Sequence, residues 1–101
     1  MTYKAFRWVE FIGFTHQALL EIQEQWKNIP QIESISAEDN LVCFEFSKYV
    51  PKDPNNMLDV KMCHEHNNRL ADFTMRRLKE SINRKCRGLY FNLKRLTIRK
   101  L

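Results

Sequence analysis

Arginine side chains gather in one stretch of the sequence, between residues 69 and 87. The stretch holds five arginines and one aromatic residue among them: Arg69, Phe73, Arg76, Arg77, Arg84 and Arg87. A guanidinium group is always charged and binds phosphate or carboxylate through two parallel hydrogen bonds. These residue types at this density therefore predict a surface that binds a polyanion.

The spacing of apolar residues indicates that this stretch is a helix with two different sides. Successive residues of a helix turn by about 100°, so its faces can be read directly from the sequence. The stripe expected to face the core comprises Ala71, Thr74, Met75, Leu78, Ile82 and Cys86. The arginines fall on the opposite side, and Phe73 lies among them. Phe73 is either a recognition hot spot or a residue that packs under a neighbouring loop.

Cys63, His64 and His66 are the residues best suited to bind a metal. Zinc sites usually combine two such pairs, and a second pair with matching spacing is missing here. On a helix, Cys63 and His66 share one side while His64 points away from them. We therefore expect no metal and no other cofactor.

The sequence carries no recognisable catalytic motif. With Gly13 and Gly88 as its only glycines, the chain cannot form a glycine-rich phosphate loop. It has no zinc-protease helix motif and no nucleophile elbow, and Glu10 on its own would not make a metal site. We predict a protein without enzymatic activity.

The first half of the chain predicts a strand, a helix and a hairpin. Residues 3–12 favour a strand that ends at Gly13, and Thr15 is a good cap for a helix reaching about residue 28 before Pro30. Strands are expected at 32–37 and 41–46, joined by a turn at 38–40. In the third strand Val42, Phe44 and Phe46 should face the core, and Leu41, Cys43 and Glu45 the other side. For the first strand, the pattern does not decide between Phe6 with Trp8 and Tyr3 with Arg7 and Phe11.

The second half predicts one long helix and a last strand. Asn56 and Asp59 resemble a capping box, and the helix could run to Arg87 with Gly88 as its terminator. Asn67-Asn68 could interrupt it. The last strand is expected at 89–98, where the shift in apolar periodicity around Lys94-Arg95 predicts a bulge.

The resulting order is β-α-β-β-α-β, within one α+β domain spanning residues 1–101. Its simplest packing is a ferredoxin-like plait, a four-stranded antiparallel sheet with two helices on one face. The RNA recognition motif has the same shape, but the third strand here lacks the basic-glycine-aromatic opening of that motif.

Charge is divided unevenly along the chain. Residues 1–75 carry a net charge of −4, whereas residues 76–101 carry +9, including Lys94 and Arg95 on the last strand. Such asymmetry favours a polyanionic partner. We expect a small nucleic-acid-binding domain that holds phosphates through the arginine-rich helix and the basic last strand.

The alternative is a small protein that binds and modulates a larger complex through an acidic protein surface. In size and lack of catalytic residues the chain is similar to inhibitors made by phages and mobile elements. Both hypotheses are compatible with a homodimer. An N-terminus without an apolar signal segment, no membrane-length apolar run and an odd number of cysteines lead us to expect a cytoplasmic protein.

Overall fold

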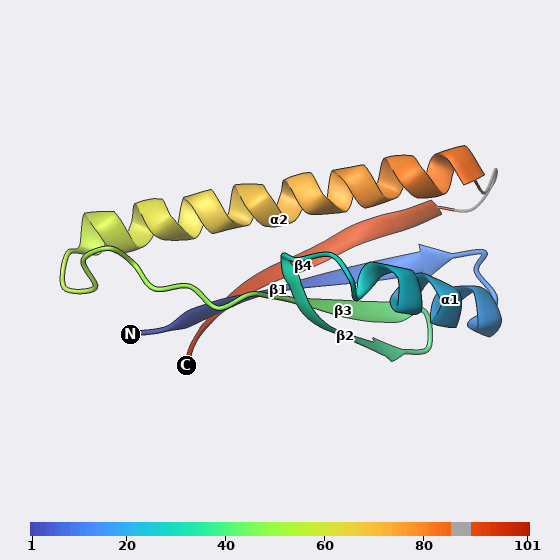
Figure 1. Cartoon of the computed structure of the whole chain (residues 1–101), viewed down its shortest axis with the longest axis horizontal. Coiled ribbons are helices and arrows are strands. Elements are labelled where there is room, and N and C mark those ends of the chain that lie inside the picture. Colours follow the sequence, from blue (N-terminus) through green and yellow to red (C-terminus); the bar gives the residue numbers. More distant parts are fainter. Residues whose placement is uncertain (86–89) are drawn as a thin grey trace.

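The computed structural model describes residues 1–85 and 90–101, and the side chains of residues 1–81 and 91–101. The elements follow the predicted order: β1 (Tyr3–Ile12), α1 (His16–Trp26), β2 (Ile32–Glu38), β3 (Leu41–Phe46), α2 (Met57–Lys85) and β4 (Tyr90–Lys100) (Figure 1). The strands form one antiparallel sheet in the order β2-β3-β1-β4. The predicted α+β class and the four-stranded antiparallel sheet with two helices are therefore confirmed.

Both helices begin at the residues that the sequence predicts. Thr15 Oγ1 accepts a hydrogen bond from the Ala18 amide at 3.1 Å, which satisfies one of the unpaired amides in the first turn of α1. Asn56 Oδ1 accepts in the same way from the Leu58 amide at 3.0 Å. The Asn56 amide donates to the Asp53 carbonyl at 3.1 Å, so only one half of the expected capping box forms.

Helix α2 is continuous over its 29 residues and sets the length of the molecule. At 1.5 Å per residue it spans about 43 Å, and the molecule is 46 Å along its longest axis. The helix passes through Asn67 and Asn68 without a break, and the side-chain amide of Asn67 donates to the Cys63 carbonyl, one turn earlier, at 2.9 Å. The expected end at Arg87 and the terminator Gly88 lie outside the described residues.

The predicted bulge in the last strand is confirmed. Along β1 the pairing moves two residues, from Arg7 to Val9, while the partners on β4 move three, from Leu96 to Leu93. The extra residue falls at Lys94-Arg95, where the apolar periodicity shifts.

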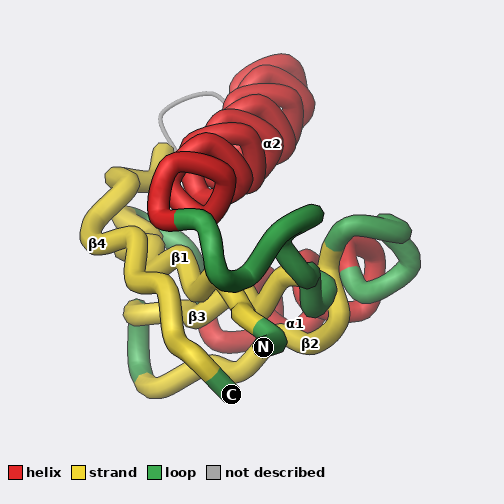
Figure 2. The backbone as a smooth tube through the Cα atoms, turned by 90° about the vertical axis from the view of Figure 1, so that its left-hand side faces the viewer, coloured by secondary structure: helices red, strands yellow, loops and turns green. Residues whose placement is uncertain are grey.

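Both helices pack on the same face of the sheet and share one hydrophobic core with it. Trp26 of α1 packs against Phe11, Phe44 and Phe91, with ring centroids 6.0, 5.5 and 6.2 Å away. Figure 2 shows α2 above the β4–β1 side of the sheet and α1 near β2 and β3. Of the stripe predicted for α2, four residues are buried: Ala71, Thr74, Met75 and Leu78. The side chain of Ile82 and all of Cys86 lie outside the described residues.

Replacing Leu78 with alanine should lower the free energy of unfolding by about 2–5 kcal/mol, because the side chain is 7% exposed in this core. Phe73→Ala on the same helix is the matched control, since Phe73 is 56% exposed and should change stability by less than about 0.5 kcal/mol. Urea unfolding measures both. Equal midpoints for the two variants would contradict the orientation of α2.

Candidate nucleic-acid interface

The predicted arginine side of α2 is exposed to solvent. We call this side, which is turned away from the sheet, the outer face of α2; its residues include Leu58, Met62, Arg69, Leu70, Phe73, Arg76 and Arg77, all of them exposed. The Arg77 guanidinium lies over the Phe73 ring, 5.7 Å from its centroid. The side chain of Arg84 and all of Arg87 lie outside the described residues.

The basic residues of β4 lie on a different side of the molecule. Lys94 Nζ is 3.5 Å from Glu10 Oε1, and the Arg95 guanidinium lies over Trp8. Glu10 and Trp8 project from the face of the sheet opposite the helices, because the alternate residues Val9 and Phe11 are buried beneath them. The predicted site residues therefore form two surfaces, one on α2 and one on β4, with the sheet between them.

The face of the sheet that no described helix covers carries the second surface. This open face comprises Lys4, Phe6, Trp8 and Glu10 of β1, Leu41, Cys43 and Glu45 of β3, and Lys94, Arg95 and Arg99 of β4. For β3 this is the side that the sequence predicts. For β1 the structure decides the open question: Phe6 and Trp8 face outward, and Arg7 and Phe11 face the helices.

Two arginines lie over two aromatic rings on the open face. The Arg95 guanidinium is 5.6 Å from the Trp8 centroid, and the Arg99 guanidinium is 4.9 Å from the Phe6 centroid. Neither arginine forms an ion pair with any residue that the structure describes. A cation–π contact at an exposed site contributes only about 0.5–1 kcal/mol, so either guanidinium can leave its ring for a stronger charged partner.

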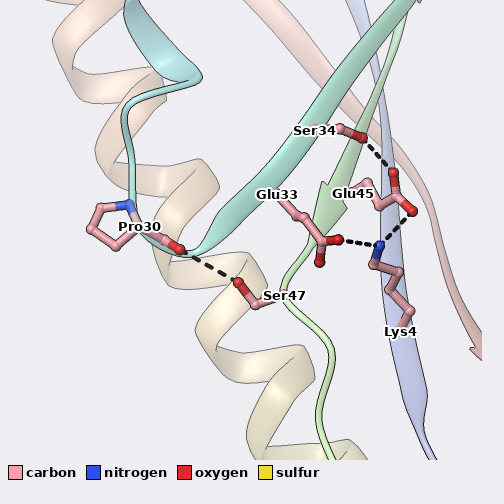
Figure 3. Close-up of polar contacts among 6 residues, drawn as sticks. All are labelled: Lys4, Pro30, Glu33, Ser34, Glu45 and Ser47. Carbon is pink, nitrogen blue, oxygen red and sulfur yellow. Dashed lines mark hydrogen bonds and ion pairs between the residues drawn. The ribbon is translucent and has the colours of Figure 1, made fainter.

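Lys4 holds the other half of the open face together, as Figure 3 shows. Its ammonium lies 2.8 Å from Glu45 on β3 and 3.0 Å from Glu33 on β2, and Ser34 donates to the other oxygen of Glu45. Burial alone would lower the pKa of Lys4, but the hydrogen bonds to the two carboxylates outweigh it and raise the pKa overall. The bond from Lys4, followed by that from Ser34, lowers the pKa of Glu45.

The cluster of Lys4, Glu33, Ser34 and Glu45 makes the charge on the two halves of the open face different. Lys4 is opposite Arg99 in the pairing of β1 with β4, and two like charges in such positions would repel one another. Two carboxylates pair with Lys4, whereas Arg99 forms no ion pair with any described residue. The carboxylates of β2 and β3 are thus paired with Lys4, whereas Arg95 and Arg99 on β4 lie beside aromatic rings and form no ion pair within the described part of the chain.

In the described part of the chain, the cysteine and histidine side chains do not come together as a metal site. Tyr49 and His64 share a hydrogen bond of 2.8 Å between the hydroxyl and Nδ1, and the rings of His64 and Tyr3 meet in a T-shaped arrangement. No three His, Cys, Asp or Glu side chains of the described residues come close enough to hold a metal ion. Burial raises the pKa of the Cys43 thiol, which disfavours the reactive thiolate.

The site residues expected from the sequence did not include Phe6 and Trp8. The signal that could have found them is alternation along residues 3–12, but Lys4 and Arg7 are both buried and lie on opposite faces, so charge does not mark the exposed side. Arg7 points toward α2, where it pairs with Asp72.

Comparisons of this chain with models of protein families, with curated proteins and with solved structures found no match. Among the described residues, no helix is both long enough and apolar enough to span a membrane.

The Lys4 cluster predicts a specific dependence of stability on pH. Because the pKa of Glu45 is lowered by folding, its contribution is complete above its unfolded pKa, about 4.3, and is lost as the pH falls through the lower folded value. Glu45→Gln should reduce stability at neutral pH by about 1–3 kcal/mol and flatten the acid side of the profile.

Urea unfolding between neutral pH and acid measures this effect. Glu24→Gln is the matched control, since Glu24 pairs with Lys27 on the surface and should contribute at most about 1 kcal/mol. If Glu45→Gln left the acid limb as steep as in the parent protein, the cluster would not stabilise the fold.

Proposed function

We propose that this protein binds single-stranded nucleic acid on the open face of its sheet, across β1 and β4, without catalysing a reaction. The observation that carries the proposal is the pair of contacts of Arg95 on Trp8 and Arg99 on Phe6. Guanidinium groups bind phosphates, and aromatic rings or guanidinium planes stack on bases. The open face offers both kinds of group side by side.

The spacing of the two rings favours an unpaired strand. Phe6 and Trp8 are two residues apart on one strand, which separates their backbone positions by about 6.7 Å. Stacked bases in a duplex rise by only about 3.4 Å along each strand. Bases that stack on both rings must therefore separate from one another, which a single strand allows and a duplex resists.

The basic last strand has the main role in this proposal, and the arginine-rich helix a secondary one. Arg95, Arg99 and, beside Glu10, Lys94 are within reach of a strand lying on the open face. Arg69, Arg76 and Arg77 on the outer face of α2 add to the positive field that speeds association. Contact with nucleic acid fits a cytoplasmic protein, which is part of the proposal.

We infer further that the chain adopts the ferredoxin-like plait. The β-α-β-β-α-β succession and the order β2-β3-β1-β4 support this, since they leave β1 in the interior of a sheet with one open face. In the RNA recognition motif, which has that shape, the open sheet with its aromatic residues is the binding surface.

Trp8→Ala should weaken binding of a single-stranded oligonucleotide by about 1–3 kcal/mol, because one stacking platform is lost. Arg95→Gln with Arg99→Gln should lower the slope of log affinity against log salt by about 1.4, from two lost phosphate contacts at about 0.7 each. Fluorescence anisotropy with labelled homopolymeric DNA and RNA, over a salt series, measures both effects.

The matched control is Arg76→Gln with Arg77→Gln, which removes the same charge from the outer face of α2. It should leave the effect of Trp8→Ala intact and change the salt slope less. The proposal fails if the parent protein binds neither single strand at low salt. It also fails if the α2 pair weakens binding as much as the β4 pair.

A further inference from the structure

The outer face of α2 combines exposed apolar side chains with arginines. Met62 and Phe73 are 57% and 56% exposed. They are eleven residues apart, which is three helical turns plus about 20°, so they lie nearly in line along the helix. Leu58 extends this line toward the start of α2, and Leu70 lies beside it. Helix α2 packs against its own sheet with its other side, so these exposed side chains do not contribute to the core.

Leu70 and Phe73 form a ridge between two hollows. One hollow is lined by His66, Arg69, Asp72 and Arg76 of α2 itself. The other separates α2 from the segment 29–31 that joins α1 to β2, and its charged lining residues are Arg77 and Glu80. Leu70 and Phe73 line both hollows, so an arginine is available on either side of the apolar ridge.

The arginines of this face are available to a partner. Arg69, Arg76 and Arg77 form no ion pair with any described residue, and the nearby carboxylate of Asp72 is already paired with Arg7. The two sides of the ridge thus offer positive charge next to apolar surface.

We propose that the outer face of α2 is the docking site for an acidic amphipathic helix of a partner protein. Apolar side chains of that helix would pack on Met62, Leu70 and Phe73, and its carboxylates would pair with the flanking arginines. From Leu58 to Arg77 the face is about 29 Å long, which suits a partner helix of about five turns.

Two features favour this occupant over the other candidates. Leu58, Met62 and Leu70 have no aromatic ring, so most of this exposed apolar surface offers a base nothing to stack on. A second copy of this chain would bring an equally basic face against Arg69, Arg76 and Arg77, and like charges in contact are destabilising. An acidic amphipathic helix can pack its apolar side on the ridge and pair its carboxylates with the arginines.

This proposal does not depend on the binding of nucleic acid. The outer face of α2 points away from the sheet, and the open face is on the other side of the sheet. A protein partner on α2 therefore leaves Trp8 and Arg95 free, and the domain can hold two partners at once.

The test uses two synthetic helical peptides with the same leucine face. One carries glutamates on its polar side and the other carries lysines. Titration of the isotope-labelled protein, followed by NMR, should show the glutamate peptide shifting signals of residues 62–77 of α2, and the lysine peptide should cause no such shifts.

Variants assign the contributions. Phe73→Ala should lower the affinity for the glutamate peptide at least about tenfold, as expected for a central aromatic anchor. This loss of affinity should depend little on salt. Arg76→Gln with Arg77→Gln should lower the affinity mainly at low salt, and Arg95→Gln with Arg99→Gln should leave it unchanged. Because Phe73 is exposed, its replacement should keep the fold, which the same spectra report.

Four results would overturn the proposal: no binding of the glutamate peptide, equal binding of the two peptides, shifts confined to the open face, or a dimer in sedimentation that Phe73→Ala dissociates. The last would assign the face to a second copy. Loss of oligonucleotide binding in the β4 variant would leave this proposal unaffected, so the two sites can fail independently.

Discussion

The alternation of side chains along β1 is the constraint on which the rest of this structure depends. Successive residues of a strand point to opposite faces, so burying Val9 and Phe11 beneath the helices places Phe6 and Trp8 on the open face. A shift of one residue would exchange the two sets. The large apolar side chains of α1, α2 and β3 that meet Phe11 and Val9 make that exchange costly, since the core would receive Lys4 and Glu10 instead.

The same alternation places a charge in the core, and α2 accommodates it. Arg7 is on the helix side of β1, where burial lowers the pKa of its guanidinium without depriving it of charge at neutral pH. Asp72 of α2 forms its ion pair, and Nη1 donates to the Lys94 carbonyl at 3.5 Å. A buried charge without a partner is strongly destabilising, so this pair favours one position of α2 over β1 and β4.

The two candidate interfaces differ in the partners of their charged residues. On the open face, Lys4 and Lys94 have carboxylate partners, and Arg95 and Arg99 have aromatic ones. On the outer face of α2, three arginines flank an exposed apolar ridge. The excess positive charge of the last quarter of the chain is thus divided between two sides of the molecule that differ in what else they offer: rings beside a flat sheet on one, a ridge along a helix on the other.

The sequence by itself determined the elements and one face of most of them. Caps at Thr15 and Asn56, the turn before Leu41 and the helical stripe through Met75 are local or periodic signals, and each acts within a few residues of its own position. The exposed arginines of α2 followed from the same periodicity. Only the tertiary structure decided which side of β1 faces outward. Both sides of this strand carry large apolar residues and charged residues, so the sequence of β1 does not distinguish them. The side that is buried is set by the residues of other elements that pack against it. The tertiary structure also decided that the basic residues of α2 and β4 form two surfaces: neighbours along the chain share a charge pattern, but the sheet between them separates their side chains in space.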